Sequence, residues 1–280
     1  MSKQLMSNDV LNSLQPDCDN CFGLCCVALP YAKSADFAFD KDGGTPCKNL
    51  QSNYRCSIHS NLRNKGFKGC TVFECFGAGQ KISQVTYNGQ DWRENPEIAK
   101  EMFDVFPLLQ QLHEMLLYLN EALSIEETLP IYEELQHAIE ETEQLTNLSP
   151  NEILGLDIPS HRARVNNLLL QTSEIVRAKI KRDKKQSSKL KKGIDLIGAN
   201  VSGRDLRGSN FRGALLIATN FRKSDLRMSD FIGADLRDAD LSGANLHGSI
   251  FLTQAQVNAA KGDKHTKLPP SLNIPLHWVK

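Results

Sequence analysis

The chain has 280 residues, enough for one or two globular domains that each bury a core. Its 33 basic and 33 acidic residues cancel, so no net charge indicates nucleic acid or a membrane surface as a general partner. The N-terminus lacks an apolar stretch of signal-peptide length, and no run of about 18 apolar residues predicts a membrane span, so we expect a cytoplasmic protein without a membrane partner.

Charge is unevenly distributed along this neutral chain. Acidic side chains predominate from Pro96 to Asn147, and basic ones predominate from Arg177 to Lys192. The two stretches could attract each other or two different partners. We interpret the basic stretch as a solvated linker and expect a protein partner, with direct nucleic-acid binding as the less favoured alternative.

The sequence predicts a mixed, multidomain fold. Its parts are a loop-dominated Cys-rich metal or iron–sulfur domain over 1–92, a helical domain over 93–178, a basic linker over 179–193, a repeat over 194–253, and a capping helix with an extended tail over 254–280.

All the cysteines of the chain lie in one block near the N-terminus. The eight are Cys18, Cys21, Cys25, Cys26, Cys47, Cys56, Cys70 and Cys75. Glycine and proline are frequent in the same block, which predicts loops and few long elements. Such a segment buries little apolar surface, so it needs a cross-link such as a disulfide or a bound metal in order to fold. In a reducing compartment, clustered thiols indicate a metal rather than disulfides.

Thiolates bind zinc, copper(I) and iron–sulfur clusters. The spacing of Cys18 and Cys21 is common to zinc and iron–sulfur sites. Eight thiols could supply two tetrahedral zinc sites, or one four-cysteine cluster with further structural or labile thiols, and the spacing does not decide. Adjacent Cys25 and Cys26 do not chelate one ion comfortably, so one of them could face a different centre. His59 is a further candidate ligand, although a surface position is the simpler interpretation.

The block resembles the zinc- or iron-chelating Cys-rich domains. The matching motifs are Cys18-x-x-Cys21-x-x-x-Cys25-Cys26, Cys47-Lys-Asn-Leu50, Cys56-Ser-Ile58 and Cys70-Thr-Val-Phe73-Glu-Cys75. This resemblance implies zinc or an iron–sulfur cluster as the cofactor. The chain departs from the pattern at Gly66-Phe67-Lys68-Gly69, where relatives usually carry Arg-Pro. A related motif in flagellin lysine methylases, which look like iron–sulfur proteins, keeps an enzyme as an alternative, although the sequence has no methyl-donor loop.

Residues 95–186 have the apolar periodicity of helices. Pro96 and Pro107 each suit a first helical turn, and the apolar face from Leu109 to Leu123 follows the second proline. Further helices are expected at about 130–146 and 160–182, and Ser149-Pro-Asn-Glu152 has the pattern of a capping box. We interpret the apolar positions as core between helices rather than as a cofactor pocket.

Residues 194–253 repeat every five residues, with a small residue first, Asp or Asn second, and Leu, Phe or Val third. This period fits neither a helix nor a flat strand, but four units would close a coil of twenty residues. The third positions then stack as Leu196/Leu216/Leu236, Val201/Phe221/Leu241, Leu206/Leu226/Leu246 and Phe211/Phe231/Phe251. Arg204 breaks the small-residue rule, so the first coil is expected to be open or irregular there.

This pattern resembles the pentapeptide-repeat family, which implies a right-handed quadrilateral β-helix, here of three coils. Thr253 to Lys261 is predicted to form a helix that caps it, because an open solenoid end exposes core and unpaired backbone. Gyrase-protecting quinolone-resistance proteins of this family are DNA mimics. Three coils of balanced charge are too short and too neutral for that role.

We find no catalytic constellation in the sequence. The leading hypothesis is therefore a non-catalytic, metal-binding cytosolic protein whose solenoid and helices form a scaffold for a protein partner. The alternatives are an iron–sulfur-dependent redox or protein-modifying enzyme or subunit, and a redox or metal sensor. Phe76-Gly-Ala-Gly-Gln80 is interpreted as a turn, because the Lys-Ser/Thr of a phosphate-binding loop does not follow it.

Overall fold

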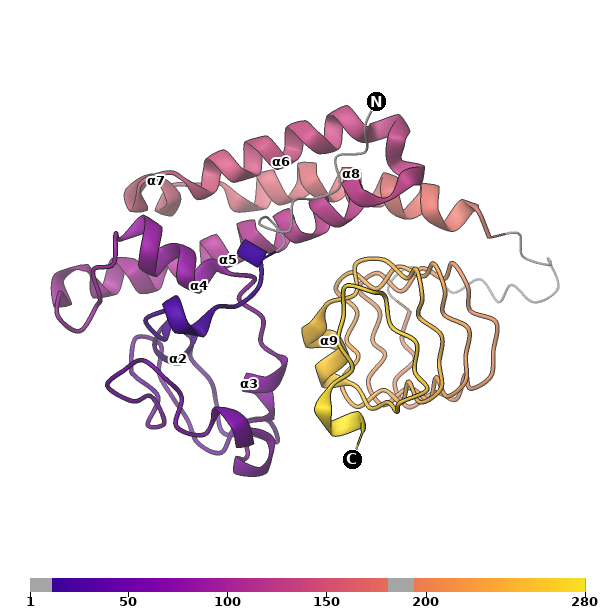
Figure 1. Cartoon of the computed structure of the whole chain (residues 1–280), viewed down its shortest axis with the longest axis horizontal. Coiled ribbons are helices and arrows are strands. Elements are labelled where there is room, and N and C mark those ends of the chain that lie inside the picture. Colours follow the sequence, from indigo (N-terminus) through magenta and orange to yellow (C-terminus); the bar gives the residue numbers. More distant parts are fainter. Residues whose placement is uncertain (1–11, 181–193, 280) are drawn as a thin grey trace. The chain divides into compact units, whose positions relative to one another are not determined.

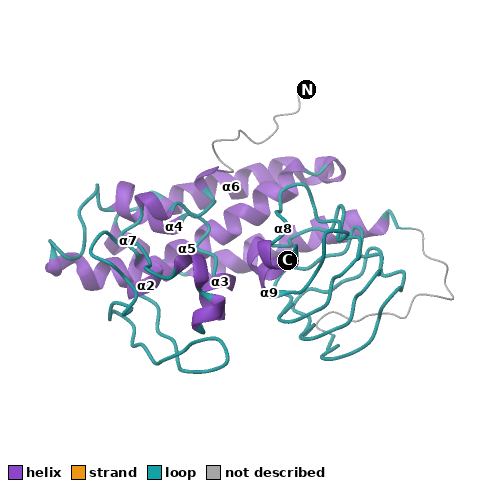
Figure 2. Ribbon diagram, turned by 60° about the horizontal axis from the view of Figure 1, so that its bottom comes forward, coloured by secondary structure: helices purple, strands orange, loops and turns teal. Residues whose placement is uncertain are grey.

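The computed structural model describes residues 12–180 and 194–279 (Figure 1). The chain divides into two compact units, of which the first ends at Leu169 and the second begins at Leu170. Long helices belong to the first unit, and winding loops make up most of the second (Figure 2). Most of the predicted linker over 179–193 lies outside the described residues.

The N-terminal part of the first unit, residues 18–92, is called the head below. Its helices are short: η1 (Cys18–Asn20), α2 (Leu24–Val27), η2 (His59–Asn61), η3 (Arg63–Lys65), α3 (Lys68–Val72), α4 (Ala78–Gln80) and the π-helix η4 (Lys81–Thr86). Single antiparallel bridges join Tyr31 to Lys41 and Leu50 to Cys56. The expectation of loops with few long elements is met.

Long helices form the rest of the first unit. They are α5 (Pro96–Ser124), the 3-10 helix η5 (Glu126–Ile131), α6 (Tyr132–Thr146), α7 (Pro150–Leu154) and α8 (Ile158–Ala178), whose end lies in the second unit. Helix α5 packs against α6 and α7. From α8, Arg162 reaches Glu114 on α5, and His161 pairs with Thr142 on α6.

Two predictions about prolines need correction. Pro107 does not begin a helix but lies inside α5. Proline removes one backbone hydrogen bond there, yet Phe106 and Leu109 are fully buried on either side of it, so tertiary packing keeps the helix continuous. Pro130 belongs to η5, and the following α-helix begins at Tyr132. The capping box of Ser149 and Glu152 is confirmed.

The second unit contains the repeat, residues 194–253, which is called the coil below. Parallel bridges join residues twenty apart, among them Asp195 to Leu215, Asn200 to Asn220, Asp205 to Asp225 and Asn210 to Asp230. The predicted twenty-residue register is therefore confirmed. Each bridge is isolated, and the described ranges contain no extended strand or sheet, because a turn in every five residues leaves one residue per unit placed to pair. This corrects the expected β-helix to a stack of coils joined by single bridges.

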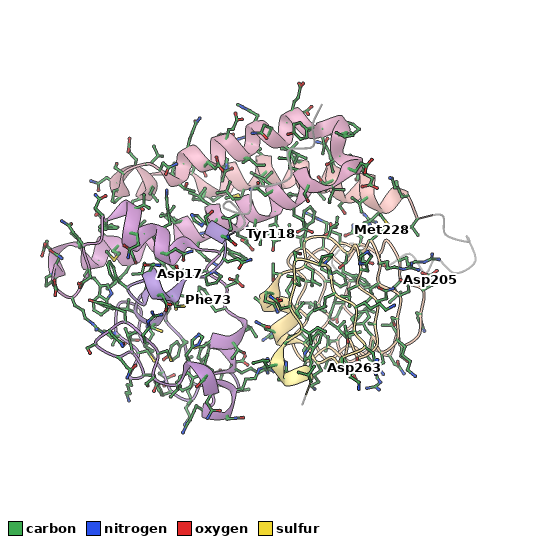
Figure 3. The ribbon with its side chains drawn as sticks, viewed as in Figure 1. Asp17, Phe73, Tyr118, Asp205, Met228 and Asp263 are labelled. Atoms are coloured by element: carbon green, nitrogen blue, oxygen red, sulfur yellow. The ribbon has the colours of Figure 1, made fainter. Side chains whose placement is uncertain are left out.

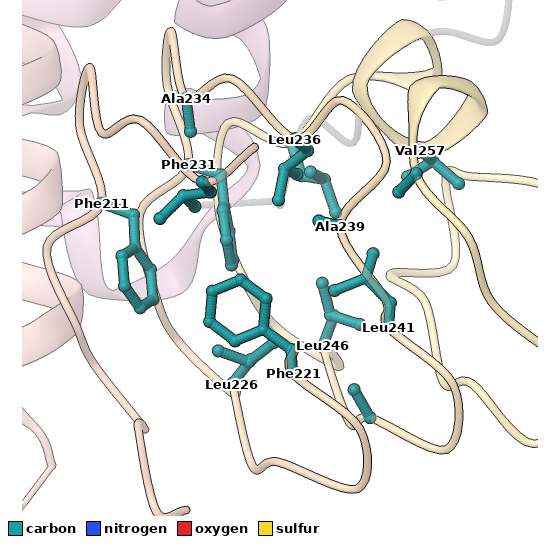
Figure 4. Packing of buried hydrophobic residues seen from close by; sticks show 14 of the residues in the cluster. Phe211, Phe221, Leu226, Phe231, Ala234, Leu236, Ala239, Leu241, Leu246 and Val257 are labelled. Carbon is teal, nitrogen blue, oxygen red and sulfur yellow. The ribbon is translucent and has the colours of Figure 1, made fainter. Parts of the chain in front are cut away.

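The sequence rule of the repeat has a direct physical cause. Third-position side chains fill the core (Figure 4), where the rings of Phe211 and Phe231 stack with centroids 5.2 Å apart. Second-position Asp and Asn accept the backbone N–H two residues later, as Asp205 does from Arg207. Figure 3 labels the Asp205 side chain. The fifth position has a positive φ, which favours glycine, although Ala218 and Met228 also adopt it. Arg204, as expected, is exposed.

The C-terminal end of the coil is capped. Helix α9 (Gln254–Ala259) begins at a capping box of Thr253 and Gln256, which confirms the predicted capping helix. The tail ends in η6 (Leu276–Trp278), where the buried Trp278 donates its indole N–H to the Ala260 carbonyl at 3.1 Å. The tail therefore packs on the coil, as predicted, and its last turn is helical rather than extended.

Candidate metal centre

Cys18, Cys21 and Cys75 lie around the start of α4. The η1 turn begins at Cys18 and is followed directly by Cys21, and it contacts α4. The Phe22 N–H donates to Ser83 Oγ at 3.0 Å, which ties the segment after Cys21 to the π-helix. A Cβ atom on Gly79 would lie 2.7 Å from Cys21 Sγ, so only glycine permits this approach of backbone to sulfur. These contacts bring cysteines from the two ends of the block together.

Cys26, Cys47 and Cys56 are joined through the backbone. The Cys47 N–H donates to the Cys26 carbonyl at 2.9 Å. The Leu50 N–H donates to the Cys47 carbonyl at 2.9 Å, and Leu50 pairs with Cys56 in an antiparallel bridge. Three cysteines that are well separated in sequence thus lie on neighbouring backbone segments.

Tyr31 connects Cys70 to this second group. The Tyr31 hydroxyl donates to Cys47 Sγ at 3.2 Å. Its ring contacts that of Phe67 edge-on, and the Cys70 N–H donates to the Phe67 carbonyl at 3.2 Å. Burial raises the pKa of Tyr31, and negative charge on Cys47, Cys70 and Cys26 raises it further. The phenol therefore faces three thiols.

Cys25 and Cys26 are adjacent residues on the single turn of α2. Their sulfur atoms are 4.0 Å apart, about twice the length of a disulfide bond, and all eight cysteines of the chain are free. The Cys25 thiol donates toward Cys26, which raises the pKa of Cys25 and lowers that of Cys26. No disulfide joins the pair in this structure, and Cys26 is the sulfur more ready to ionise.

Backbone N–H groups point at several of the sulfur atoms. The Asn49 N–H donates to Cys47 Sγ at 3.5 Å. N–H groups two residues after Cys21, Cys56 and Cys75 also lower the pKa of those thiols. Burial is the larger effect and raises the pKa of all three thiols, that of Cys75 to about 11. Donors aimed at sulfur stabilise a thiolate, and hydrogen bonds of this kind tune thiolate-bound metals.

Two charged groups of the head were not singled out by sequence reasoning. Lys41 is buried, and its Nζ donates to the carbonyls of Val27, Asp42 and Thr45 at 3.0–3.1 Å. Burial lowers the pKa of Lys41, whereas negative charge on Cys47, Cys26 and Cys25 raises it. A lysine inside a cysteine block gives no periodic signal, so only the folded chain shows this cation beside the thiols.

Glu74 is the second such group. Its Oε1 is buried without a hydrogen-bond partner in the described part of the chain, and burial raises the pKa of Glu74 to about 7. The only signal in the sequence is its position directly before Cys75. A carboxylate held in this way adds an oxygen donor next to a thiol.

The remaining sequence candidates lie at the edges of the head. His59 is exposed and begins η2, so its role as a ligand stays a prediction. The glycine-rich segment from Phe76 to Gln80 forms a turn that leads into α4, as predicted. A Cβ atom on Gly77 would lie 2.0 Å from the Ser13 carbonyl oxygen, so this turn packs against backbone rather than cradling a phosphate.

The sulfur atoms are grouped but not gathered to coordination distance. Over residues 12–180 and 194–279, no three His, Cys, Asp or Glu side chains converge closely enough to hold one ion. The donor set itself fits a soft metal, because it consists of free thiols with N–H groups directed at them. The metal site therefore stays a prediction, with its ligands supplied by the eight cysteines.

Comparison with known proteins identifies the coil. The Pentapeptide repeats family matches residues 194–231 and 214–251. The chain belongs to the pentapeptide-repeat family. "Uncharacterized protein YybG" of Bacillus subtilis (strain 168) is 67% identical over 279 residues, which cover 99% of this chain and 100% of that protein. Relatives of this pentapeptide-repeat protein thus share the head as well as the coil, although the family match itself covers only the coil.

Two solved pentapeptide repeat proteins are similar to part of the chain. One, from Nostoc Pcc 7120, is 32% identical, covers 29% of this chain and 74% of its own, and has a TM-score of 0.21. The other, from the Arabidopsis thaliana thylakoid lumen, is 27% identical, covers 30% of this chain and 63% of its own, and has a TM-score of 0.15. Among the described residues of the chain, no helix combines the length and the apolar character that a membrane crossing requires.

Proposed function

We propose that this pentapeptide-repeat protein is a non-catalytic metal-binding protein of the cytoplasm. Its head holds zinc or an iron–sulfur cluster through cysteine thiolates, and its helices and coil present surfaces to a protein partner. The observation that carries the proposal is that all eight cysteines are free and lie within one loop-rich block, where the Asn49 N–H is directed at Cys47 Sγ. Grouped free thiols are the ligands that soft metals prefer, and a bound metal deprotonates them.

A metal accounts for the stability of the head. Its helices have one or two turns, and a metal bound by cysteines from its two ends would close these loops. Zinc would supply a structural link, and an iron–sulfur cluster would add an electron-transfer group. Free thiols at this density persist in a reducing compartment, which is why we place the protein in the cytoplasm.

The coil is suited to a scaffold. We interpret its stacked turns as the right-handed four-sided helix of the family, with an apolar interior and a surface of short polar side chains. Arginines pair with aspartates two residues earlier, as Arg227 does with Asp225 and Arg237 with Asp235. A surface neutralised in this way lacks the continuous negative charge of a DNA mimic.

The test is the metal content of protein purified without oxygen. We expect zinc, or iron with sulfide, in a fixed ratio to protein, and a visible absorption band if iron is present. Cys21→Ser should lower the metal content, whereas Ser57→Ala, an exposed change beside Cys56, should not. Wild-type protein that contains neither metal and does not take up zinc would contradict the proposal.

A redox sensor is the second candidate, and the vicinal thiols favour it. Cys25 and Cys26 are free, and their sulfur atoms lie 4.0 Å apart. Hydrogen peroxide would accept two electrons and two protons from the two thiols, so that an S–S bond forms, the O–O bond breaks and two water molecules leave. Mass spectrometry of mildly oxidised protein should then locate a bond between these two residues, and reaction at other cysteines first would count against this role.

A further inference from the structure

The coil departs from its own repeat rule at one exposed position. In ten of its twelve units, the second residue is Asp or Asn and accepts the backbone N–H of the fourth residue. The two exceptions are Leu215 and Ile250. Ile250 is only 4% exposed, whereas Leu215 is 43% exposed. Leu215 therefore gives up a turn hydrogen bond without becoming buried within the chain, and such a departure from a local rule indicates a functional surface.

Leu215 belongs to one of the four faces of the coil. This face is called the leucine face below and consists of residues 194–198, 214–218 and 234–238. Parallel bridges join Asp195 to Leu215 and Leu215 to Asp235. The second positions of the face therefore form a column that runs along the stack, with Leu215 in the middle and an aspartate on either side.

The fourth positions of the leucine face form a second column, which is largely apolar as well. Ile197 is 52% exposed, and Ile217, one coil later, is partly exposed. The third member of this column is Arg237, whose Nη2 lies 2.6 Å from Asp235 Oδ2. Both isoleucines lie on the outside of the coil, where contact with water is unfavourable for apolar groups. The leucine face therefore presents an apolar patch beside one ion pair.

The leucine face is complementary to a second copy of itself. A two-fold axis along the stack would place each coil against the same coil of the second copy, with the second position opposite the fourth. Leu215 would then contact Ile217 of the second copy, and Asp235 would contact Arg237 of the second copy, with each contact made twice. A two-fold axis across the stack would instead place Asp195 against Asp235, so the charges favour the first arrangement.

We propose that the protein forms a two-fold homodimer through the leucine face. The adjoining segment 181–193 does not match this face, because Leu190 is its one apolar residue. Each copy contributes a small patch, so the dimer is weak and its population depends on protein concentration. The inference rests on the scaffold part of the proposed function, whose partner it names. It does not depend on a metal in the head, because the coil contains no cysteine.

Sedimentation of the full chain over a wide range of protein concentrations tests the dimer. The wild-type protein should change from monomer to dimer as its concentration rises. Leu215→Asp follows the repeat rule, so the coil should keep its thermal stability. This variant should weaken dimerisation by at least about tenfold, because it removes two apolar side chains from the centre of the interface. Asn200→Asp, at an exposed second position of the next face, is the matched control and should dimerise like the wild type.

The ion pair provides a second test, which examines the two-fold arrangement. Arg237→Asp and Asp235→Arg should each weaken the dimer, because each places like charges opposite one another across the interface. The double variant that carries both changes restores opposite charges and should recover dimerisation. A double variant no better than the single variants would overturn the arrangement.

Two results would overturn the dimer itself. One is a wild-type chain that stays monomeric at every concentration, and the other is a Leu215→Asp chain that dimerises as tightly as the wild type. The metal content of the same wild-type sample is measured separately. A monomer that contains metal would therefore refute this inference alone, whereas a dimer without metal would refute only the metal-binding part of the proposed function.

Discussion

The coil and the head are both built from short segments, yet they are stabilised in different ways. In the coil, every unit after the first buries an apolar third residue, and successive turns are hydrogen-bonded, so residues 194–253 form a continuous core without a cysteine. In the head, one-turn helices and loops carry eight thiols, of which Cys18 and Cys70 are exposed, and aromatic contacts around Tyr31 supply a small apolar cluster. Regular repetition supplies a core from local sequence, whereas the irregular head is the part for which we propose a metal cross-link.

Metal removal should separate the two regions most clearly. If the head binds a metal as we propose, a strong chelator should unfold the head and leave the coil folded, because the coil contains no cysteine. Structural zinc contributes on the order of 10 kcal/mol to the folding of small domains. Limited proteolysis with mass spectrometry should show new cleavage within 18–92 and none within 194–253. Equal protection of the head before and after chelation would contradict this dependence.

Phe231→Ala should have the opposite effect to metal removal, because it should destabilise the coil and leave the head unchanged. The Phe231 side chain is fully buried and stacked on Phe211, so its removal leaves a cavity in the coil and should cost about 3–5 kcal/mol in free energy of unfolding. Denaturant unfolding should record the loss, while the metal content stays at the wild-type value. Leu215→Ala, at a side chain 43% exposed, is the matched control and should cost much less. A similar loss in both variants would show that the stack does not hold the coil together.

His113 should make the stability of the first unit depend on pH. Its Nδ1–H donates to the Phe76 carbonyl at 2.7 Å, and burial lowers the pKa of His113 to about 4. The unfolded chain takes up a proton near pH 6.5 while the folded chain does not, so stability is complete above that pH and falls as the pH drops toward 4. The expected loss is on the order of 3 kcal/mol.

Unfolding of wild-type and His113→Gln proteins between pH 7 and 4.5 measures this contribution. The variant should be less stable at pH 7 and should lose less stability on acidification than the wild type. His247→Gln, an exposed change in the coil, should retain the wild-type pH dependence. Parallel curves for wild-type and His113→Gln proteins would exclude His113 as the source.

The smallest expected effect concerns the fifth position of the repeat. Ala218 has φ +54°, a conformation that glycine adopts without steric cost. Ala218→Gly should therefore stabilise the coil by up to about 1 kcal/mol. Ala214→Gly, at a buried first position, should destabilise it and serves as the control. Thermal unfolding of the two variants compares them, and destabilisation by Ala218→Gly would show that strain at this turn is negligible.

The sequence by itself determined the coil and the helix ends that rely on local chemistry. The twenty-residue register, the four apolar stacks, and the capping boxes at Ser149 and Thr253 follow from side chains that act within one turn or one repeat. Each third-position residue has an equivalent neighbour one coil away, so a local pattern specifies the whole core.

Only the tertiary structure decided the features that depend on contacts between distant segments. Packing on both sides of Pro107 keeps α5 continuous there, although proline locally favours the start of a helix. The grouping of the cysteines, the burial of Lys41 among three carbonyls and the unpartnered Glu74 oxygen arise where loops from separate parts of the head meet. The spacing of thiols in sequence indicates a metal, but their distribution around α4 and Tyr31 depends on how the loops fold, because no periodic backbone relates them.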